Sequence, residues 1–324
     1  MSVIGLDLGG TKLAAAILGE DGAIIHRAQA ALEGRGGDAV GRLMTDHLAE
    51  LLAYGRAHDL AIGAVGVSVP GIYHREAGTV WAPNIPGWES YPLRELFRAH
   101  AGAGVALAID SDRACSILGE AARGAALGCA HAIFLAVGTG IGAGILVGGE
   151  VLRGAHDIAG AVGWMALDRP HRAEYEACGC FESRASGAGI ARQARRRLAE
   201  SPDHDGPLRR IDPARLTAQD VFAASDQGDP LAEAVLADAV ACWGMAVANL
   251  VSLFNPEVVV FGGGLFGPAA RLLDRIVAEA RRWAQPVSIQ RVAIRVTTLG
   301  PEACLYGTGQ LALEAFRTAD SLKG

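Results

Sequence analysis

Two glycine-rich turns, each carrying a threonine, are the parts of the sequence with the clearest chemical meaning. One turn spans residues 9–12 (Gly-Gly-Thr-Lys), the other spans residues 138–142 (Gly-Thr-Gly-Ile-Gly), and an apolar run precedes each. Glycines allow a backbone to approach a polyphosphate closely, with its N–H groups directed at phosphate oxygens. Either turn alone could be an ordinary tight β-turn, but its occurrence once in each half of the chain predicts a pair of phosphate-binding turns.

Charged residues flank the first turn. Asp7 directly precedes it, where a carboxylate can hold Mg²⁺ directly or through water. Lys12 ends the turn, and its ammonium group can offset phosphate charge. The residues predicted to bind the nucleotide at these two turns are Asp7, Gly9, Gly10, Thr11, Lys12, Thr139 and Gly140.

A third glycine cluster consists of Gly262, Gly263 and Gly264. It follows an apolar run at residues 258–261 and precedes a helical pattern. Bare backbone at this point would let a flat adenine or ribose lie close to the chain. A strand-to-helix turn needs at most one or two glycines, so three in succession favour a nucleotide contact, with a sharp turn as the alternative.

Two aspartates, Asp110 and Asp112, end an expected strand at residues 105–109. Residues two apart on a strand point to the same face, so both carboxylates could serve one site. Phosphoryl transfer to an alcohol benefits from a carboxylate that orients the hydroxyl and accepts its proton. One of the two is therefore the candidate general base. For Asp112 the alternative is a cap of the helix expected to start near Ala114.

Apolar periodicity places these residues on two successive α/β segments. In the first segment, strands are expected at residues 3–8, 13–18, 23–25, 61–69 and 105–109, with helices at 41–60 and 93–100. In the second, strands are expected at 132–137, 143–147, 258–261 and 292–297, with helices at 231–254, 268–283 and 303–316 and a frayed tail at 317–324. Because a strand, a glycine turn and a returning strand occur twice, the architecture is expected to be duplicated.

The composition is that of a folded protein with two compact lobes. The chain has 324 residues, of which 51% are hydrophobic and 20% are charged, and its formal net charge is -6. An acidic protein is not expected to bind nucleic acid generally, since that affinity comes mostly from basic side chains. The arginine-rich stretch at residues 192–197 is interpreted as the solvated face of an amphipathic helix.

The start of the chain and its cysteines favour a cytoplasmic protein. The sequence opens directly on a strand, without the basic and apolar segments of a secretory signal, and leaves no room for a helix-turn-helix module before Val3. Its six cysteines are scattered and are expected to be reduced thiols. We find no uninterrupted apolar run of about twenty residues, so no membrane span is expected.

Taken in order, the motifs resemble those of the ROK family (repressor, open reading frame, kinase) of sugar kinases and sugar-responsive regulators. The matching segments are residues 7–12, 69–71, 83–88, 119–120, 138–142, 179–182, 186–187, 255–257 and 262–264. The resemblance implies an α/β protein with the duplicated actin-like ATPase (ribonuclease H-like) fold, in which two lobes flank a cleft. We place a sugar- and phosphate-binding lobe at residues 1–112, to which a last helix near 303–317 can return, and a nucleotide-binding lobe at residues 113–302. ATP, Mg²⁺ and a homodimer or higher homo-oligomer are also implied.

The resemblance also assigns individual acceptor residues. An Asn-Asp pair of the family, a sugar contact followed by the catalytic base, falls on Ser111 and Asp112 when counted back from the Gly-Glu pair at 119–120. Asp112 is therefore preferred to Asp110 as the base. The other acceptor contacts implied by the family pattern are Gly71, Asn84 and Glu182.

The sugar motif of the chain departs from the family pattern. A glutamate and a histidine of the family are replaced by Ala161 and Trp164, so a carboxylate becomes a methyl group and an imidazole becomes an indole. In the family the same histidine binds a structural zinc with three cysteines. Here only Cys180 clearly holds a family ligand position. Cys178 and Cys180 are too few for a closed tetrahedral site with four protein ligands, so we predict no structural zinc.

The whole pattern predicts an ATP-dependent kinase that transfers the γ-phosphate to a hydroxyl of a hexose or related polyol. His156 could compensate for the lost polar groups or lie in an exposed loop with Asp157, and Trp164 could stack on the sugar or fill the space of the zinc site. Each charged hydrogen bond contributes about 1.5–3 kcal/mol, so the altered motif predicts a different or less polar acceptor. The alternative function is a sugar-sensing protein of the same family with impaired catalysis and no DNA-binding module.

Overall fold

The structure, a computed structural model, describes residues 1–321, which form two compact units. Unit 1 comprises Met1–Gly128, Val151–Ala159 and the chain from Pro301 onward, and unit 2 comprises Cys129–Glu150 and Gly160–Gly300. The division expected at residue 112 differs from this one. The helix after that residue packs against the C-terminal helix of unit 1, and Arg153 of the segment 151–159 binds Asp110, so both belong with unit 1.

Unit 1 is built on a five-stranded sheet with the order β3-β2-β1-β4-β7. Its strands are β1 (Ser2–Leu8), β2 (Lys12–Gly19), β3 (Ile24–Ala31), β4 (Ile62–Val69) and β7 (Ala106–Ser111). The first three form an antiparallel meander, whereas β4 runs parallel to β1 and β7 runs parallel to β4. A small hairpin, formed by β5 (Ile72–His74) and β6 (Thr79–Trp81), was not expected from the sequence, because three-residue strands are too short to show a period.

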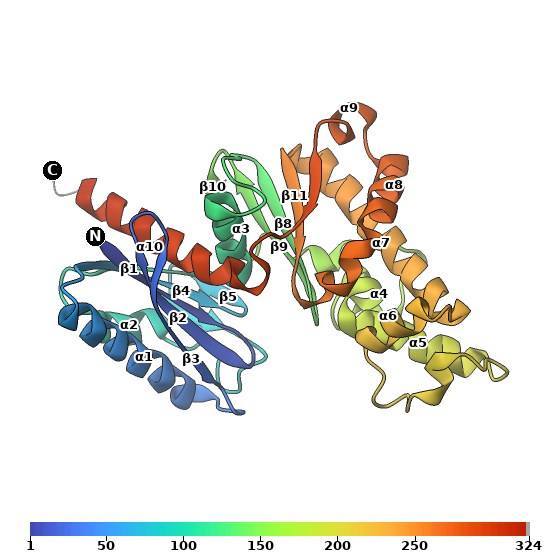
Figure 1. Ribbon diagram of the computed structural model, residues 1–324, viewed down its shortest axis with the longest axis horizontal. Coiled ribbons are helices and arrows are strands. Elements are labelled where there is room, and N and C mark those ends of the chain that lie inside the picture. The colour runs from blue at the N-terminus through green and yellow to red at the C-terminus, as the bar shows by residue number, and fades with distance from the viewer. Residues whose placement is uncertain (322–324) are drawn as a thin grey trace. The chain divides into compact units, whose positions relative to one another are not determined.

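Alternate residues of β1 face opposite sides of this sheet. The even-numbered ones pack beneath the helices α1 (Gly37–Ala57) and α2 (Leu93–Ala101). Val3 and Gly5 contact the C-terminal helix α10 instead, so Asp7 also faces the α10 side. Figure 1 shows the resulting layers of unit 1, with α10 on one side of the sheet and α1 and α2 on the other.

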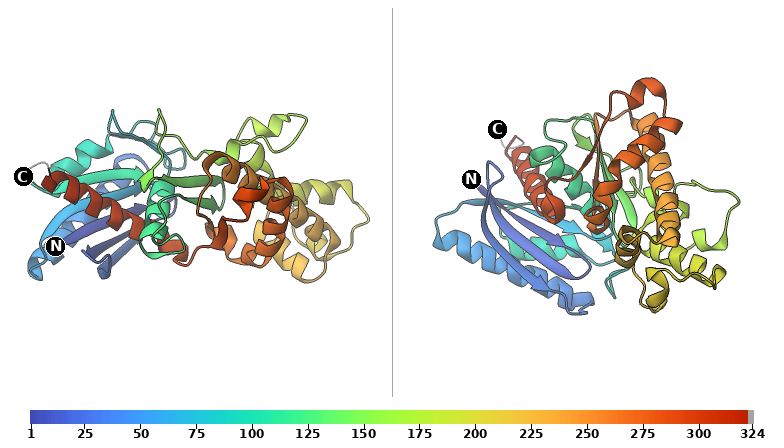
Figure 2. Two further views of the ribbon diagram at one scale, coloured as in Figure 1. Left: turned by 90° about the horizontal axis from the view of Figure 1, so that it is seen from above. Right: turned by 45° about the vertical axis from the view of Figure 1, so that its right-hand side comes forward.

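The helices α3 (Asp112–Arg123) and α10 (Ala303–Ser321) cross so closely that glycine is needed at the crossing. A Cβ at Gly119 of α3 would overlap the carbonyl oxygen of Ala303, and one at Gly307 of α10 would overlap that of Cys115. In both views of Figure 2 the red C-terminal helix lies along the blue N-terminal strands, in agreement with its contacts to β1 and β4. The N-terminus of α3 is thereby fixed against α10.

Unit 2 repeats the sheet of unit 1 with the order β10-β9-β8-β11-β12. Its strands are β8 (Ala132–Val137), β9 (Ile141–Val147), β10 (Glu150–Val151), β11 (Val258–Gly262) and β12 (Ala293–Val296). The second glycine turn joins the antiparallel pair β8 and β9, whereas β11 runs parallel to β8 and β12 runs parallel to β11. The two strand orders match position by position, which confirms the expected duplication.

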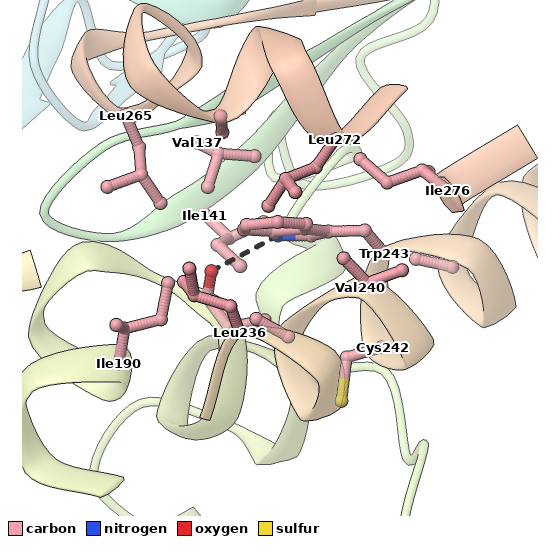
Figure 3. Close-up of a cluster of buried hydrophobic side chains, with 14 of the residues drawn as sticks. Val137, Ile141, Ile190, Leu236, Val240, Cys242, Trp243, Leu265, Leu272 and Ile276 are labelled. Atoms are coloured by element: carbon pink, nitrogen blue, oxygen red, sulfur yellow. Dashed lines mark hydrogen bonds between the residues drawn. The ribbon is translucent and has the colours of Figure 1, made fainter. Parts of the chain in front are cut away.

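The helices of unit 2 pack around α7 (Pro230–Phe254). The others are α4 (Cys180–Ala185), α5 (Gly187–Glu200), α6 (Ala218–Asp226), α8 (Leu273–Trp283) and α9 (Pro286–Ile289). Trp243 of α7 is fully buried, and its indole N–H donates to the carbonyl oxygen of Ala185 at 3.1 Å. Figure 3 shows Val137 and Ile141, which flank the second glycine turn, in the same apolar cluster. The core therefore anchors both ends of that turn.

By length and composition alone, α7 could cross a membrane. It has 25 residues, and the mean hydropathy of its most apolar stretch is 1.7. However, 67% of that stretch is buried inside the protein, and Trp243 lies among its buried residues. A helix that is apolar on most sides is expected in the core of a large folded unit, and α7 is such a core helix.

The arginine-rich stretch lies on α5, and the interleaved apolar residues are buried, as expected for an amphipathic helix. Arg197 forms an ion pair with Asp238 at 2.6 Å, and Arg195 donates to the carbonyl oxygen of Leu216 at 3.0 Å. These arginines bind neighbouring groups of unit 2, which agrees with their interpretation as the polar face of a helix.

Two expected helices have different bounds in the structure. The helix expected at residues 268–283 is divided into a 3₁₀ turn, η5 (Pro268–Leu272), and α8. The final helix α10 continues to Ser321, so residues 317–321 of the tail expected to be frayed are helical, while residues 322–324 lie outside the described part of the chain. The six cysteines are free thiols, as expected.

Candidate active site

A row of three polar side chains crosses the sheet of unit 1 at the carboxyl ends of its parallel strands. In the strand register, Asp7 of β1 pairs with Ser68 of β4, and Ser68 pairs with Asp110 of β7. The Ser68 hydroxyl donates to Oδ1 of Asp7 at 2.8 Å. Ligands of open α/β sheets bind outside the carboxyl ends of the strands, so this row marks the candidate site of unit 1.

Asp110 is held by arginines. Arg153 approaches its Oδ2 with Nε at 2.8 Å and Nη2 at 2.7 Å, and Nη2 of Arg75 lies 3.5 Å from the same oxygen. Its side chain is only 8% exposed. Hydrogen bonds between a guanidinium group and a carboxylate are strong because both partners are charged, and they occupy this carboxylate. Asp110 thus fastens the segment 151–159 to the sheet and is a poor candidate for a general base.

Asp112 stands at the first position of α3, and Ser111 is the cap of this helix. The Ser111 hydroxyl accepts a hydrogen bond from the backbone N–H of Ala114 at 3.3 Å. Oδ1 of Asp112 accepts from the backbone N–H of Arg113 at 2.8 Å, and the Asp112 side chain is 48% exposed. The capping role that the sequence left open for Asp112 therefore belongs to Ser111. The Asp112 carboxylate remains accessible to a substrate.

Burial and neighbouring groups set the pKa of Asp112. Close packing around the carboxyl group raises its pKa to about 6, while the charge of Arg113 lowers the pKa and the charge of Asp7 raises it. Nε of Arg113 lies 3.9 Å from Oδ1 of Asp112, and Nη2 of Arg113 donates to the carbonyl oxygen of Gly71 at 3.5 Å. A carboxyl group whose pKa lies closer to neutrality accepts a proton more readily, as a general base must.

The first glycine turn also belongs to unit 1. Gly9 donates its N–H to the carbonyl oxygen of Lys12 at 2.9 Å, which closes the turn, and both Thr11 and Lys12 are exposed. A Cβ at Gly10 would lie 2.9 Å from Nδ2 of Asn84. The structure thus places Asn84, expected on the acceptor side, directly against the expected phosphate turn.

The other acceptor residues expected in unit 1 are Gly71 and His156. The carbonyl oxygen of Gly71 accepts the Arg113 hydrogen bond, and Arg113 also borders Asp112. His156 is exposed, and the neighbouring Asp157 accepts from the backbone N–H of Arg75 at 3.1 Å. His156 therefore lies in an exposed loop that Arg153 binds to β7 and Asp157 binds to the β5–β6 hairpin.

In unit 2, Glu182 of α4 holds the second glycine turn. Its Oε2 accepts from the backbone N–H of Ile141 at 2.6 Å, and a Cβ at Gly140 would lie 2.7 Å from the same oxygen. Thr139, at the tip of the turn, is exposed. Burial raises the pKa of Glu182, and the Ile141 hydrogen bond lowers it in part. The contact of Glu182 with the turn was not expected from the sequence.

The three glycines after β11 lie beside the same turn. Gly263 has a φ of +87°, and a Cβ there would lie 2.5 Å from the carbonyl oxygen of Val137, the residue before the turn. A Cβ at Gly138 would lie 3.9 Å from the backbone nitrogen of Gly264, and a Cβ at Gly264 would meet nothing within 4 Å. Unit 2 therefore brings both of its expected nucleotide-binding segments together.

Trp164 is 58% exposed, so it does not fill an interior space, and one of the two interpretations of this residue is removed. Within residues 1–321 no group of three or more His, Cys, Asp or Glu side chains is placed to hold a metal ion. Sγ of Cys178 lies 3.2 Å from the hydroxyl oxygen of Ser183, and Cys180 is buried. The absence of a structural zinc stays a prediction.

Sequence reasoning missed the side chains that hold the site of unit 1. They are Ser68, Arg75, Arg113, Arg153 and Cys304. Sγ of Cys304 donates to the Ser68 hydroxyl oxygen at 3.0 Å and so joins α10 to the polar row. Ser68 could have been found, because it ends a strand directly before the Val-Pro-Gly motif at residues 69–71. The arginines gave no signal, since most of their partners are distant in sequence.

Known proteins resemble the chain over nearly its whole length. The family model described as "ROK family" matches residues 3–315. A glucokinase from Halalkalibacterium halodurans is 31% identical over 316 residues, which is 95% of this chain and 94% of that protein. The crystal structure of a ROK hexokinase from Thermus thermophilus has a TM-score of 0.79 at 28% identity and covers 100% of both chains. A ROK family glucokinase from Streptomyces griseus, in complex with glucose and AMPPNP, has a TM-score of 0.72 at 27% identity and covers 97% of this chain and 100% of that one.

Proposed function

The chain belongs to the ROK family and is an ATP-dependent sugar kinase, and we propose that it phosphorylates a hydroxyl of a hexose or related polyol with Asp112 as the general base. Its fold is the duplicated actin-like ATPase fold of its structural relatives. One observation carries the proposal for Asp112. Its carboxylate is accessible at the strand ends, and its pKa is raised to about 6.

In this proposal Asp112 takes the proton of the acceptor hydroxyl as the oxygen attacks the γ-phosphorus of ATP. The bond between the γ-phosphorus and the β,γ-bridging oxygen breaks, and ADP leaves. The other strand-end aspartate, Asp110, is already bound by Arg153, which supports the choice of Asp112. The rate of phosphoryl transfer depends mainly on how the substrates are positioned and on how the developing charge is stabilised. The base therefore provides only part of the rate enhancement, and the residues that position the substrates provide the rest. A positioned base contributes about 10²–10⁴-fold to the rate.

Asp7 is assigned to Mg²⁺, either directly or through a water molecule. Carboxylate oxygens are ligands that Mg²⁺ prefers, and Asp7 stands at a strand end with Ser68 as its hydrogen-bond partner. When bound, Mg²⁺ neutralises charge on the β- and γ-phosphates. The residues assigned to the nucleotide are Gly9, Gly10, Thr11 and Lys12 in unit 1 and Thr139, Gly140, Gly262, Gly263 and Gly264 in unit 2.

The acceptor is assigned to six further residues besides Asp112. They are Gly71, Asn84, Ser111, His156, Trp164 and Glu182. Ala161 offers a methyl group and forms no charged hydrogen bond with a hydroxyl, which supports an acceptor bound in part by apolar contact. The exposed indole of Trp164 provides such a surface.

We further propose that the kinase works in the cytoplasm as a homodimer or higher homo-oligomer, with a sugar or polyol as its small-molecule partner. Its net charge of -6 and the internal partners of the α5 arginines support the absence of nucleic-acid and membrane partners. Light scattering coupled to size-exclusion chromatography tests the oligomeric state.

A coupled ADP-release assay over a panel of hexoses and polyols tests the proposed reaction. Wild type is compared with Asp112→Asn and with Asp46→Asn, an exposed aspartate of α1. We expect Asp112→Asn to lower turnover of the best acceptor by about 10²–10⁴-fold and Asp46→Asn to leave it unchanged. Equal turnover by wild type and Asp112→Asn rejects Asp112 as the base.

Calorimetry separates the kinase from a sugar-sensing protein with impaired catalysis, which the replacements at Ala161 and Trp164 suggest as a second candidate. The kinase is expected to bind AMPPNP in the presence of Mg²⁺ as well as a sugar. Binding of sugar without binding of the nucleotide supports the sensor and contradicts the kinase.

A further inference from the structure

A cavity of about 570 Å³ opens on unit 2 beside the 3₁₀ turn η1 (Val162–Trp164). The indole of Trp164, more than half exposed, lines this cavity together with Ala166 and Tyr175. Small-molecule sites usually have volumes of about 300–1,000 Å³, so the cavity is large enough for a ligand ring.

Hydrogen bonds hold the wall of the cavity in place. The Tyr175 hydroxyl donates to Oδ2 of Asp168 at 2.8 Å, and Arg184 forms an ion pair with the same carboxylate. The backbone N–H of Arg169 donates to Oδ1 of Asp168 at 2.9 Å. Burial and the bond to Asp168 raise the pKa of Tyr175 to about 12, so its hydroxyl keeps its proton. The wall is therefore formed before a ligand binds, which lowers the entropy cost of binding.

The chemistry of the lining fits a neutral polyhydroxylated ring. The charged and titratable residues of the lining are Asp168, Arg169, His171 and Glu176. Because Asp168 is already paired with Arg184, one cation, one titratable ring and one anion are left, and the lining does not select strongly for a charged ligand. Their side chains offer hydrogen-bond donors and acceptors. The exposed indole of Trp164 offers a flat apolar surface, against which the C–H face of a pyranose can lie. A sugar ring presents both kinds of surface.

The turn η1 connects this cavity to the residues that hold the second glycine turn. A Cβ at Gly163 would lie 2.8 Å from the carbonyl oxygen of Ile141 and 3.1 Å from Cβ of Glu182. Trp164, the next residue, lines the cavity, whereas Ile141 and Glu182 do not. The cavity is thus adjacent to Glu182 but distinct from the place that the Glu182 carboxylate occupies.

We propose that this cavity is a subsite for a second, non-reacting sugar ring that stacks on Trp164, so that the preferred acceptor is a disaccharide or another glycoside. The proposal rests on the proposed function, because it takes Glu182 as a contact of the reacting ring. The proposal also accounts for Ala161. Because Ala161 stands where the family has a carboxylate, the reacting ring lacks one hydrogen bond, and contacts to the second ring offset this loss.

Two variants and one control test the subsite. Trp164→Ala removes the stacking surface, and Ala166→Tyr fills the cavity from an exposed position, so neither change disturbs the core. Trp283→Ala is the control, because Trp283 is also exposed, at 61%, and does not line the cavity. ADP release is measured with glucose against maltose and cellobiose, and with galactose against lactose and melibiose.

For wild type we expect kcat/KM for at least one disaccharide to exceed that for its monosaccharide about tenfold or more. Trp164→Ala and Ala166→Tyr are each expected to lower this ratio at least fivefold, while Trp283→Ala leaves it unchanged. If both variants leave the ratio as in wild type, or if every monosaccharide is the better acceptor, the subsite is rejected while the kinase assignment stands.

A binding measurement keeps failure of the subsite distinct from failure of the kinase reaction. Tryptophan fluorescence of wild type and Ala166→Tyr is titrated with the same disaccharides. A saturable change that Ala166→Tyr abolishes supports the subsite even if no sugar on the panel is phosphorylated. The absence of a saturable change in wild type overturns it.

Discussion

The two units share one sheet topology and differ in the residues that end the matching strands. In unit 1, the residue pair one position before the end of β1 and β4 is Asp7 and Ser68. In unit 2 the matching pair on β8 and β11 is Ala136 and Gly262. A carboxylate and a hydroxyl of one sheet are therefore replaced by a methyl group and a hydrogen atom in the other.

This difference shows how one scaffold can carry two kinds of chemistry. The strand ends of unit 1 hold carboxylates, which can bind a metal ion and accept a proton. Those of unit 2 hold small residues, which let a ligand approach the backbone. Its nearby carboxylate, Glu182, comes from the helix α4 and binds the glycine turn. We infer that the fold fixes where the ends of the strands lie, and that a few side chains decide what each end does.

The cores of the two units offer the strongest test of whether the duplicated sheets are stabilised separately. Trp243→Ala is expected to lower the free energy of unfolding of unit 2 by about 3–5 kcal/mol, because it leaves a large cavity and an unpaired carbonyl oxygen at Ala185. Trp88→Ala is the matched change in unit 1, since Trp88 is 1% exposed and stacks on Tyr91 with ring centroids 4.4 Å apart. Urea unfolding followed by circular dichroism and by proteolysis measures both.

Each tryptophan change is expected to shift one unfolding transition and leave the other in place. A single shared transition that both variants shift equally would contradict separate stabilisation. The second glycine turn is anchored in the Trp243 cluster, so Trp243→Ala is also expected to raise KM for ATP.

The pH dependence of the reaction tests the chemistry assigned to unit 1. Asp112 must be ionised to accept a proton, and its pKa is raised from 3.8 to about 6. We therefore expect kcat/KM to fall as pH drops through about 6 and to approach a tenfold loss per pH unit below that. Asp112→Asn should lack this acid limb in its residual activity. An acid limb that persists in the variant assigns the titration to another group.

The same shift predicts a change in stability. Between pH 3.8 and about 6 the folded protein holds a proton on Asp112 that the unfolded chain has released. Stability from this group therefore falls as pH rises through that window. At pH 8 Asp112→Asn is expected to melt at a higher temperature than wild type, as often happens when a strained catalytic group is removed. Differential scanning fluorimetry measures the melting temperatures of both proteins at pH 4 and pH 8, and the advantage of the variant should be larger at pH 8.

Local patterns in the sequence predicted much of this molecule. The two glycine turns and the strands around them were predicted because a turn residue and its neighbours act over a few positions. The duplication followed from the repetition of that pattern. The candidate base was narrowed to Asp110 or Asp112 by strand alternation, and the resemblance to a family chose between them.

Contacts between distant residues could not be predicted. Arg153 and Asp110 are 43 residues apart, and neither has a neighbour that signals the other. The cap of α3 is Ser111, one residue before Asp112, which the sequence left open as the cap, because serine and aspartate are both good caps and only the backbone decides between them. The boundary between the units was also missed, since α3 crosses α10 at glycines almost two hundred residues apart in the chain, a separation that no local pattern reports.

Glu182→Gln tests the contribution of unit 2. The amide oxygen can still accept from the Ile141 N–H, but a neutral acceptor is weaker than a charged one, and a loss of about 1 kcal/mol is expected. This corresponds to a rise of about fivefold in KM for ATP, and KM for the sugar is expected to rise as well, because Glu182 is also assigned to the acceptor. Asp168→Asn is a control for loss of a carboxylate elsewhere in unit 2 and should leave KM for ATP unchanged. A rise confined to KM for the sugar would place Glu182 with the acceptor alone.

The smallest expected effect concerns Ser111, which caps α3 and directly precedes Asp112. Ser111→Ala and Thr217→Ala each remove an N-cap, of α3 in unit 1 and of α6 in unit 2, and each should cost about 1 kcal/mol of stability. Only Ser111→Ala is expected to lower kcat, by a few-fold, because Asp112 follows Ser111 directly and its orientation depends on how α3 begins. Denaturant titration and ADP release measure the two quantities. If both variants lose stability and neither loses activity, the start of α3 positions Asp112 without help from the Ser111 hydroxyl.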